Sequence, residues 1–501
     1  MNDISPLHLI DGYKIDHRRQ YPEGTEFVYS NLTPRKFRIP VDRAVFFGLQ
    51  AFVKNHLIEE WNRLFFNQPK EVVVSRYARR IKNYLGNSNI SFEHIEALHD
   101  LGYLPIRIKA LDEGSVVKAN IPVLTITNTD PRFFWLTNYF ETILSNAIWK
   151  PMTSATIARQ YLKLLTEYAE ITGSDPDMIQ FQAHDFSFRG MSGVEDAVLS
   201  GAGHLTCFSG SDTLPAIDFL EACYNANSDI ELVAMSVAAT EHSVMCAGQP
   251  DGEFETFKRL ITEIYPGLDK DFFEIVSIVS DTWDLWKVIG EFIPRLKGEI
   301  LARNGKVVIR PDSGDPVKII VGDPDYCEPE NPWREALVRK GVVEALWDIF
   351  GGTFTNQGYK LLDFHIGAIY GDSITLERAK AILEGLRLKG FASINIVFGV
   401  GSYTYEYVTR DTLGIAMKAT RVRINGKWSN IFKSPKTDDG TKNSHTGWLC
   451  VVHDENRDAA VIQDVPAIIE NIGFLTPVFE DGRLLKDDTL AQIRERVKAN
   501  I

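Results

Sequence analysis

Charged side chains that could bind a polyanion occur where apolar runs of the sequence end. In the clearest case, Arg310 and Asp312 follow the apolar run 307–309, with proline between them and Ser-Gly after them. Proline removes a backbone donor and fixes φ, and Ser-Gly turns the chain, so a buried strand must end here. The sequence therefore predicts a cation and a carboxylate at the carboxyl end of a strand, the edge where α/β folds bind ligands.

The same arrangement recurs along the chain. Polar loops after other apolar runs, and a later segment, carry Asp185, Arg189, Asp212, Glu241, His242, Asp281, Asp372 and Arg410. Arginines hold phosphates and Mg²⁺ bridges phosphates to carboxylates, so this set predicts a phosphorylated substrate. For any single aspartate, a helix N-cap or an Asx turn explains the residue equally well. That explanation does not account for arginines at the same strand ends.

His242 is the one histidine that we single out in this set. A lone histidine is more often structural than catalytic. Among arginines at the mouth of a barrel, we favour an imidazole that contacts phosphate or accepts a phosphoryl group. No second histidine or cysteine lies at ligand spacing, which argues against zinc.

Two neighbouring features could bind a planar ring and a phosphate. Phe186 and Phe188 flank a serine and would point to opposite sides of an extended segment, so one could stack on a ring while Phe188 packs in the core. The glycines of Gly399-Val-Gly401 could let backbone N–H groups approach a phosphate. They lack the spacing of a dinucleotide fingerprint and the lysine of a P-loop.

The elements that position these residues are repeated. Apolar runs at 179–183, 205–208, 232–237, 275–279, 307–309, 364–370 and 394–398 each precede a polar loop, and most of the loops precede an amphipathic helix. Successive loop residues lie 27 to 60 residues apart, which is βα-unit spacing with one insertion. The pattern predicts an irregular (β/α) barrel of about seven units, with an open doubly wound sheet as the alternative.

A second, β-rich domain is expected from both ends of the chain. After an irregular arm over residues 1 to about 30, we expect helices at 44–66, 76–85 and 92–101 and strands within 106–127. Long helices follow at 133–149 and 153–171. Asn-Gly between 417–424 and 427–432 predicts a hairpin that joins those strands. The expected domains are therefore residues 1–150, 151–410 and 411–501, the last packing on the first.

Composition restricts the class of protein. The 501 residues exceed what one hydrophobic core supports, and 44% hydrophobic and 24% charged residues are ordinary for a globular enzyme. A net charge of -13 argues against nucleic-acid and anionic-membrane binding. Five cysteines without C-x-x-C spacing and no apolar run of about 20 residues predict a cytoplasmic protein without a membrane span.

The motifs together resemble the nicotinamide phosphoribosyltransferase family of type II phosphoribosyltransferases, nearly from end to end. The similarity is carried by Asp11-Gly-Tyr13-Lys14, Asn128-Thr-Asp130, Trp135-Leu-Thr-Asn138, His184-Asp185-Phe186, Arg189-Gly190, Asp212-Thr213, Glu241-His242-Ser243, Val279-Ser-Asp281, Ile309 to Gly314, Gly371-Asp372 and Thr409-Arg410-Asp411. The resemblance implies transfer of phosphoribose from phosphoribosyl pyrophosphate to nicotinamide.

The resemblance also implies residue roles. Phe186 would stack on one face of the pyridine ring, and Tyr13 from the partner subunit of a homodimer would stack on the other. The partner subunit would also bring Asp11 to the site. Asp212 would accept a hydrogen bond from the carboxamide NH₂. Arg310 would lie near the carboxamide and the phosphates. Ribose and phosphates would be held by Arg189, Asp281, Arg310, Asp312, Gly371, Asp372, Gly401, Ser402 and Arg410, and Mg²⁺ by Asp281 and Asp312, directly or through water. His242, with Glu241 and Asp312 as further catalytic residues, would be phosphorylated by ATP as co-substrate. Ser402 stands where animal members carry glycine.

Three other functions are alternatives to phosphoribosyl transfer to nicotinamide. A nicotinate phosphoribosyltransferase on this fold would need a cation at the ring substituent, whereas Asp212 would repel a carboxylate. A catalytically silent signalling homologue is disfavoured by the joint presence of His242, Arg310, Asp312 and Arg410. An aldolase-type barrel would need a strand-end lysine, which none of the seven ends has.

Overall fold

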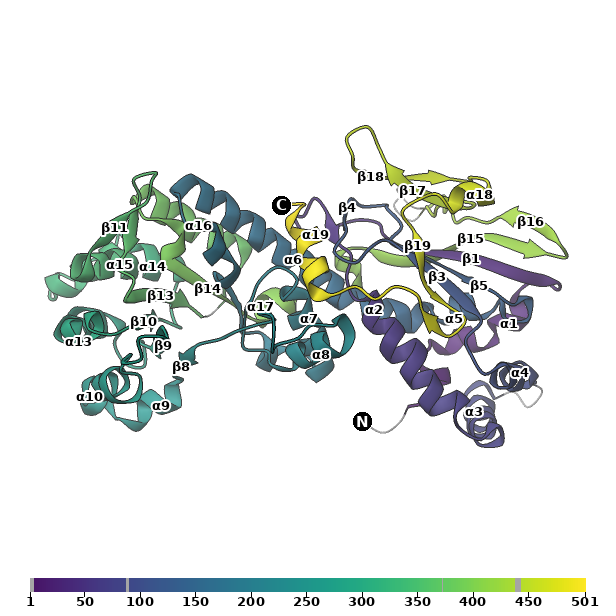
Figure 1. Ribbon diagram of the computed structural model, residues 1–501, viewed down its shortest axis with the longest axis horizontal. Coiled ribbons are helices and arrows are strands. Elements are labelled where there is room, and N and C mark those ends of the chain that lie inside the picture. Colours follow the sequence, from purple (N-terminus) through teal and green to yellow (C-terminus); the bar gives the residue numbers. More distant parts are fainter. Residues whose placement is uncertain (1–3, 87–89, 372, 438–442) are drawn as a thin grey trace. The chain divides into compact units, whose positions relative to one another are not determined.

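The computed structural model describes residues 4–86, 90–371, 373–437 and 443–501 (Figure 1). The chain forms two compact units. Unit 1 comprises residues 1–157, 218–226 and 408–500, and unit 2 comprises residues 158–217, 227–407 and 501. The sequence placed its first boundary at residue 150, whereas the first segment of unit 1 ends at Ile157, inside helix α6 (Glu141–Thr172).

Unit 2 is built on a seven-stranded parallel sheet in the order β7-β6-β14-β13-β10-β9-β8. The strands are β6 (Ala183–Asp185), β7 (Gly210–Ser211), β8 (Ala238–Ala239), β9 (Glu274–Val279), β10 (Gly305–Arg310), β13 (Ile366–Tyr370) and β14 (Ile396–Val400). Each strand therefore neighbours the next strand of this sheet along the chain, except that β7 and β8 lie at its two edges. A parallel bridge between Gly210 and Met235 joins the two edges, which confirms the irregular barrel.

Several strands begin later than the sequence predicted. Residues 179–183 belong mostly to a 3-10 helix (Pro176–Phe181), and β6 then includes Asp185 itself. The runs 205–208 and 232–237 likewise precede β7 and β8. Short buried apolar runs have no periodicity that distinguishes a strand from the turn before it, so their boundaries cannot be read locally.

Helices connect most of these strands. They are α7 (Val194–His204), α8 (Pro215–Tyr224), α9 (His242–Ala247), α10 (Glu253–Arg259), α11 (Leu285–Lys287), α12 (Ile293–Arg295), α13 (Lys297–Leu301), α14 (Pro316–Val321), α15 (Pro332–Phe350), α16 (Leu376–Leu388) and α17 (Ser402–Tyr405). The insertion between Asp312 and residue 372 consists of α14, α15 and the β11–β12 hairpin (Gly352–Phe354 and Lys360–Leu362). Side chains of Asp315, Asn331 and Thr375 cap α14, α15 and α16 by accepting backbone N–H bonds.

Unit 1 contains an antiparallel sheet in the order β16-β15-β1-β5-β3-β19-β20. Its strands are β1 (Thr25–Pro34), β3 (Ile106–Ala110), β5 (Leu124–Asn128), β15 (Ile415–Ile424), β16 (Lys427–Asn430), β19 (Thr476–Glu480) and β20 (Arg483–Leu484). The predicted hairpin is confirmed, because Asn425 and Gly426 both have positive φ between β15 and β16. It joins the sheet through β1, which the sequence analysis wrongly assigned largely to an irregular arm.

Helices α2 (Leu49–Phe52), α3 (Lys70–Leu85), α4 (Glu93–Leu101), α5 (Leu136–Tyr139), α18 (Ala467–Glu470) and α19 (Leu490–Lys498) complete unit 1, with the short pairs β2–β4 (Ala44–Val45 and Val116–Val117) and β17–β18 (Leu449–His453 and Ala459–Gln463). The prediction of two long helices separated at Pro151 is wrong, because α6 passes through this proline. Hydroxyls of Thr153 and Thr156 bond carbonyls one turn earlier in α6. Within the described ranges, no helix is both long and apolar enough to cross a membrane.

Candidate active site

A cavity of about 810 Å³ lies in unit 2 at the carboxyl ends of the barrel strands. It is lined by Phe186, Phe188, Arg189, Asp212, Thr213, Glu241, His242, Ser243, Arg310, Asp312, Gly371, Ser373, Gly401, Ser402 and Tyr403. Most of the site residues expected from the sequence are among these. The parallel strands bring them together because all carboxyl ends meet at one edge of the barrel.

Asp212 is held in the cavity by two donors. Its Oδ1 accepts hydrogen bonds from His184 Nε2 at 2.8 Å and Ser236 Oγ at 2.6 Å. Burial favours the neutral carboxyl, but the hydrogen bonds from His184 and Ser236 and the nearby charge of Arg310 outweigh it, so the pKa of Asp212 lies below its usual value. With Oδ1 occupied, Oδ2 is the oxygen available to an N–H donor on a ligand.

Phe186 lies against the ends of two strands. A Cβ on Gly399 would lie 2.6 Å from Phe186 Cδ2 and 2.7 Å from Gly371 Cα, so a side chain at this position would displace the ring. The His184 ring centroid lies 4.6 Å from that of Phe186, with an interplanar angle of 44°. The prediction that Phe188 packs in the core is wrong: this side chain is 37% exposed and lines the cavity.

The Arg310–Asp312 segment is tied to the preceding strand end by Asp281. Asp281 Oδ2 accepts the backbone N–H of Asp312 at 2.8 Å and Ser313 Oγ at 2.6 Å. Asp281 Oδ1 and Arg310 Nε are buried without a hydrogen-bond partner in the described part of the chain. An unsatisfied buried acceptor and donor next to a cavity are typical of a site that a ligand completes.

His242 is the first residue of α9 and its side chain is 51% exposed. Its Nδ1 lies 3.3 Å from Thr282 Oγ1, and its Nε2 lies 3.9 Å from Asp312 Oδ2. Glu241 occupies the N-cap position of α9 without a side-chain capping hydrogen bond, and its carboxylate accepts a hydrogen bond from the Ser243 hydroxyl. The imidazole is therefore accessible to a phosphoryl donor and lies near a carboxylate that can orient it.

Two buried polar side chains near the cavity, Asp185 and His204, do not line it but form hydrogen bonds with the surrounding segments. Asp185 is fully buried, with its two oxygens accepting the Ser187 N–H and the Thr213 hydroxyl, so it is structural and does not line the cavity. His204 bonds the Tyr405 hydroxyl at 2.7 Å and the Gly210 carbonyl at 3.1 Å. Burial lowers the pKa of His204 to about 4, so it stays neutral at physiological pH.

Not every expected residue is placed in this cavity. Asp372 lies outside the described residues, and Asp281 is not among the residues that line the cavity. Asp11, Tyr13 and Arg410 belong to unit 1, where the Asp11 N–H and carboxylate both bond the Thr142 hydroxyl and Tyr13 is 65% exposed. The arginine bonds its neighbour Asp411.

His184 and Ser236 are the residues that sequence reasoning missed. They lie 28 and 24 positions from Asp212, and neither spacing is a recognised motif. The only local signal was the position of His184 at the end of the first strand. Their role depends on strand pairing: His184 is paired with Gly210, and a Cβ there would lie 2.9 Å from His184 Nδ1.

The cavity lining contains more carboxylates than arginines, which matters for how a phosphorylated substrate could be neutralised. Three carboxylates (Asp212, Glu241 and Asp312) face two arginines, Arg189 and Arg310. Among the described residues, no group of three or more His, Cys, Asp or Glu side chains could hold a metal ion by itself. One or two carboxylates are enough for a divalent cation whose remaining ligands are substrate oxygens and water.

Comparison with known proteins identifies the family. A model described as the nicotinate phosphoribosyltransferase (NAPRTase) family matches residues 181–468, which contain the whole cavity. The chain belongs to this family of phosphoribosyltransferases. A second model, the N-terminal domain of nicotinamide phosphoribosyltransferase, matches residues 6–108.

Relatives in the family match over nearly the full length. The chain is 55% identical to nicotinamide phosphoribosyltransferase of Acinetobacter baylyi, covering 99% of this chain and 97% of the relative. It is 35% identical to the protein of the same name from Mycoplasma pneumoniae, covering 88% and 94%.

Solved structures show the same fold at low identity. Nicotinate-nucleotide pyrophosphorylase from Pyrococcus furiosus matches with a TM-score of 0.59 at 16% identity, covering 100% of this chain and 96% of the other. Human nicotinic acid phosphoribosyltransferase matches with a TM-score of 0.51 at 15% identity, covering 98% and 93%. At these identities the likeness concerns the fold alone.

Proposed function

We propose that the protein transfers the phosphoribosyl group of phosphoribosyl pyrophosphate to nicotinamide, forming nicotinamide mononucleotide and pyrophosphate for NAD biosynthesis. The observation that carries this proposal is Asp212, an ionised carboxylate in the cavity whose Oδ1 is occupied by His184 and Ser236. A carboxylate accepts the NH₂ of a carboxamide and repels the carboxylate of nicotinate. The bacterial relatives of the same name agree with this choice of substrate.

The chemistry requires positioning more than proton transfer. Departure of pyrophosphate from the anomeric carbon builds oxocarbenium character, as in glycoside hydrolysis. The pyridine nitrogen of nicotinamide then attacks that carbon and has no proton to lose, so no strong base is needed. Phe186 supplies a ring face for stacking, and Arg189 and Arg310 neutralise phosphate oxygens.

Mg²⁺ is part of the proposal because the cavity lining alone has more carboxylates than arginines. Asp281 and Asp312 would hold it, directly or through water, and Asp281 Oδ1 is a buried acceptor without a partner among the described residues. The ion would neutralise the departing pyrophosphate. Titration of isolated protein with Mg²⁺ should give weak binding that tightens when phosphoribosyl pyrophosphate is present. Equally tight binding without that substrate would contradict this arrangement.

We also propose that ATP phosphorylates His242 and that this step is coupled to synthesis. An imidazole nitrogen would attack the γ-phosphorus, ADP would leave, and water would later take the phosphoryl group. With ATP labelled in the γ-phosphate, the wild type should acquire an acid-labile, base-stable label, and His242→Ala should acquire none. A label retained by His242→Ala would exclude this residue as the acceptor.

A homodimer would bring Asp11 and Tyr13 of one subunit to the nicotinamide bound in the other. Arg410 would contact the ribose and phosphates of phosphoribosyl pyrophosphate. Tyr13 is 65% exposed within its own chain, as a side chain that contacts a partner would be. Co-expression of Tyr13→Ala with His242→Ala tests this arrangement. Recovery of activity in the mixed protein, when each variant alone is inactive, supports a shared site, and absence of recovery contradicts it.

The deciding assay measures mononucleotide formation from phosphoribosyl pyrophosphate with nicotinamide and with nicotinate, with and without ATP. A higher kcat/KM for nicotinamide supports the proposal. A higher kcat/KM for nicotinate would assign the other substrate of the family. No product with either ring would support a catalytically silent homologue.

A further inference from the structure

Unit 1 contains a second cavity, of about 380 Å³, that shares no lining residue with the candidate active site. Its floor is one face of strands β1, β5 and β3, and its walls are Trp428 and Trp448 on one side and α18 on the other. The lining residues are Glu26, Phe27, Tyr29, Arg107, Lys109, Thr125, Thr127, Asn128, Thr129, Pro131, Arg423, Trp428, Trp448, Ala467, Glu470 and Asn471. Its volume is within the range of small-molecule sites, about 300–1,000 Å³.

The strand register places the polar groups of the floor in two rows. Tyr29 pairs with Thr127, which in turn pairs with Arg107. The next row contains Thr125 and Lys109. Because residues two positions apart point to the same face of a strand, both rows face the cavity.

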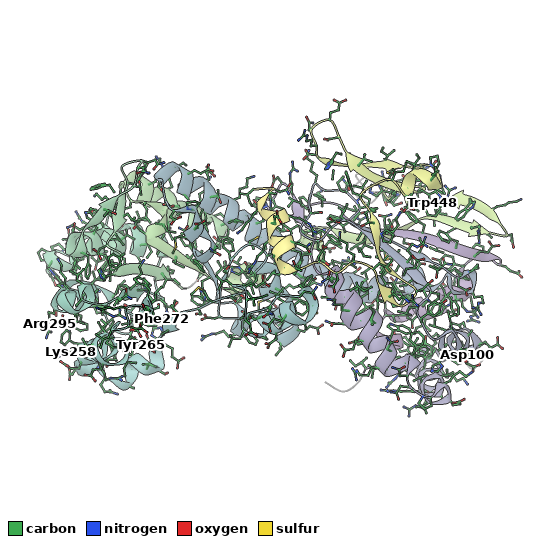
Figure 2. The ribbon with its side chains drawn as sticks, in the orientation of Figure 1. Asp100, Lys258, Tyr265, Phe272, Arg295 and Trp448 are labelled. Atoms are coloured by element: carbon green, nitrogen blue, oxygen red, sulfur yellow. The ribbon has the colours of Figure 1, made fainter. Side chains whose placement is uncertain are left out.

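One wall is aromatic. Ring centroids of Trp448 lie 4.6 Å from Tyr29, 5.6 Å from Phe27 and 5.5 Å from Trp428, and interplanar angles are 54° or more. No pair is stacked face to face, but guanidinium groups lie over both indoles: Arg421 is 5.4 Å from the Trp428 centroid and 5.6 Å from that of Trp448, and Arg423 is 5.3 Å from that of Trp428. A planar ring of a ligand would therefore stack beside these guanidinium groups. Trp428 is 42% exposed, and Trp448, labelled in Figure 2, immediately precedes β17. Such a wall offers a stacking surface for a planar ring.

The opposite wall carries a buried ion pair. Lys109 Nζ lies 2.7 Å from Glu470 Oε2, and these side chains are only 8% and 7% exposed. The ammonium also donates to Glu470 O and Asn471 Oδ1, so its three protons are used. In the described chain, Glu470 Oε1 accepts no hydrogen bond, which leaves a carboxylate oxygen beside the cavity for an amino group of a ligand.

The charge of the cavity favours an anion. Its lining has three cations, Arg107, Lys109 and Arg423, against Glu26 and Glu470, in a chain whose net charge is -13. Arg107 and Arg423 are 45% and 33% exposed and pair with one carboxylate each. Such exposed ion pairs are weak, so a phosphate can replace either carboxylate at little cost.

We propose that this cavity is a second ligand site that binds a nucleotide whose base carries an amino group. The base stacks on the wall formed by Phe27, Trp428 and Trp448, and its amino group donates to Glu470 Oε1. The phosphate binds Arg107 and Arg423. This site is independent of the proposed catalytic function, since it uses other residues in the other unit.

Adenosine monophosphate is the probe, and equilibrium dialysis with the full-length protein is the measurement. Uridine monophosphate lacks the amino group and adenosine lacks the phosphate, so both should bind at least about fivefold more weakly. Equal binding of all three, or no saturable binding of adenosine monophosphate at millimolar concentration, would overturn the proposal.

Two variants locate the binding. Trp428→Thr, on an exposed edge strand, and Arg107→Gln should each weaken binding of adenosine monophosphate by about tenfold. Arg339→Gln is the matched control for charge, because Arg339 is 46% exposed and pairs with Glu335 on α15, outside the cavity. Binding that is unchanged in Trp428→Thr and in Arg107→Gln would place the nucleotide elsewhere and refute the site. Thermal unfolding of each variant verifies that it is folded.

Discussion

Replacing Asp212 with asparagine exchanges one carboxylate oxygen for an NH₂ group at nearly constant size. Oδ1 can still accept from His184 and Ser236, as the carboxylate does now. The new NH₂ group therefore takes the position of Oδ2 and faces the ligand. A carboxylate oxygen that accepted a hydrogen bond from the carboxamide NH₂ of nicotinamide is thereby replaced by an NH₂ group that can donate one to the carboxylate of nicotinate.

The size of the effect follows from these two changes. A hydrogen bond to a charged group contributes about 1.5–3 kcal/mol, and nicotinamide loses it in Asp212→Asn. Nicotinate loses the repulsion and gains a neutral donor, about 1 kcal/mol more. The combined change of about 2.5–4 kcal/mol lowers the ratio of kcat/KM for nicotinamide over nicotinate by about 70-fold to 900-fold.

Initial rates with each ring at saturating phosphoribosyl pyrophosphate measure that ratio. Asp348→Asn is a suitable control, because this exposed carboxylate on α15 pairs with Lys340 and does not line the cavity. An unchanged ratio in Asp212→Asn, with normal folding, would refute the assignment of Asp212 to the ring substituent.

Other residues allow independent tests. His184→Ala should lower kcat/KM for nicotinamide about tenfold. Loss of its hydrogen bond raises the pKa of Asp212, so the acidic limb of the pH profile should move to higher pH. His184→Gln can still donate and should restore part of kcat/KM and part of the profile, whereas an unshifted profile in His184→Ala would contradict the role of His184 in holding Asp212. Gly399→Ala should raise KM for nicotinamide, since its Cβ would lie 2.6 Å from Phe186 Cδ2; an unchanged KM would show that the ring does not need its present position. Burial raises the pKa of Glu113 from 4.5 to about 7, so its contribution to stability is fully present below pH 4.5 and is lost as the pH rises through 7, by up to about 3 kcal/mol. Urea unfolding at pH 5 and pH 8 should therefore show a smaller loss of stability in Glu113→Gln than in the wild type, and equal losses would exclude this group as the cause.

Much of the barrel could be predicted from sequence because its signal is local. An apolar run that ends in a polar loop marks a strand end wherever it occurs, and Arg310-Pro-Asp312 could be located without knowing its neighbours. The same reasoning failed for β1, whose residues are mostly buried between β15 and β5 and so show no alternation. It also failed at Pro151, where a helix continues through a residue that usually interrupts one.

The pairing of side chains from different strands could not be predicted. Phe188 appeared to belong to the core because alternation describes one strand, whereas the segment after β6 turns as a 3-10 helix (Phe188–Gly190). His184, Asp212 and Ser236 come from three separate segments, and no single segment indicates that they meet.

By itself, the sequence determined which residue types end each barrel strand, and hence that arginines, carboxylates and one histidine would gather at one edge of the barrel. Tertiary structure decided which of those groups face the ligand. It buried Asp185, left Asp212 with one oxygen toward the cavity, and left Asp281 Oδ1 without a partner among the described residues. The physical reason is that strand ends are specified by local chain preferences, whereas burial and hydrogen bonding depend on neighbours contributed by strands far apart in the chain.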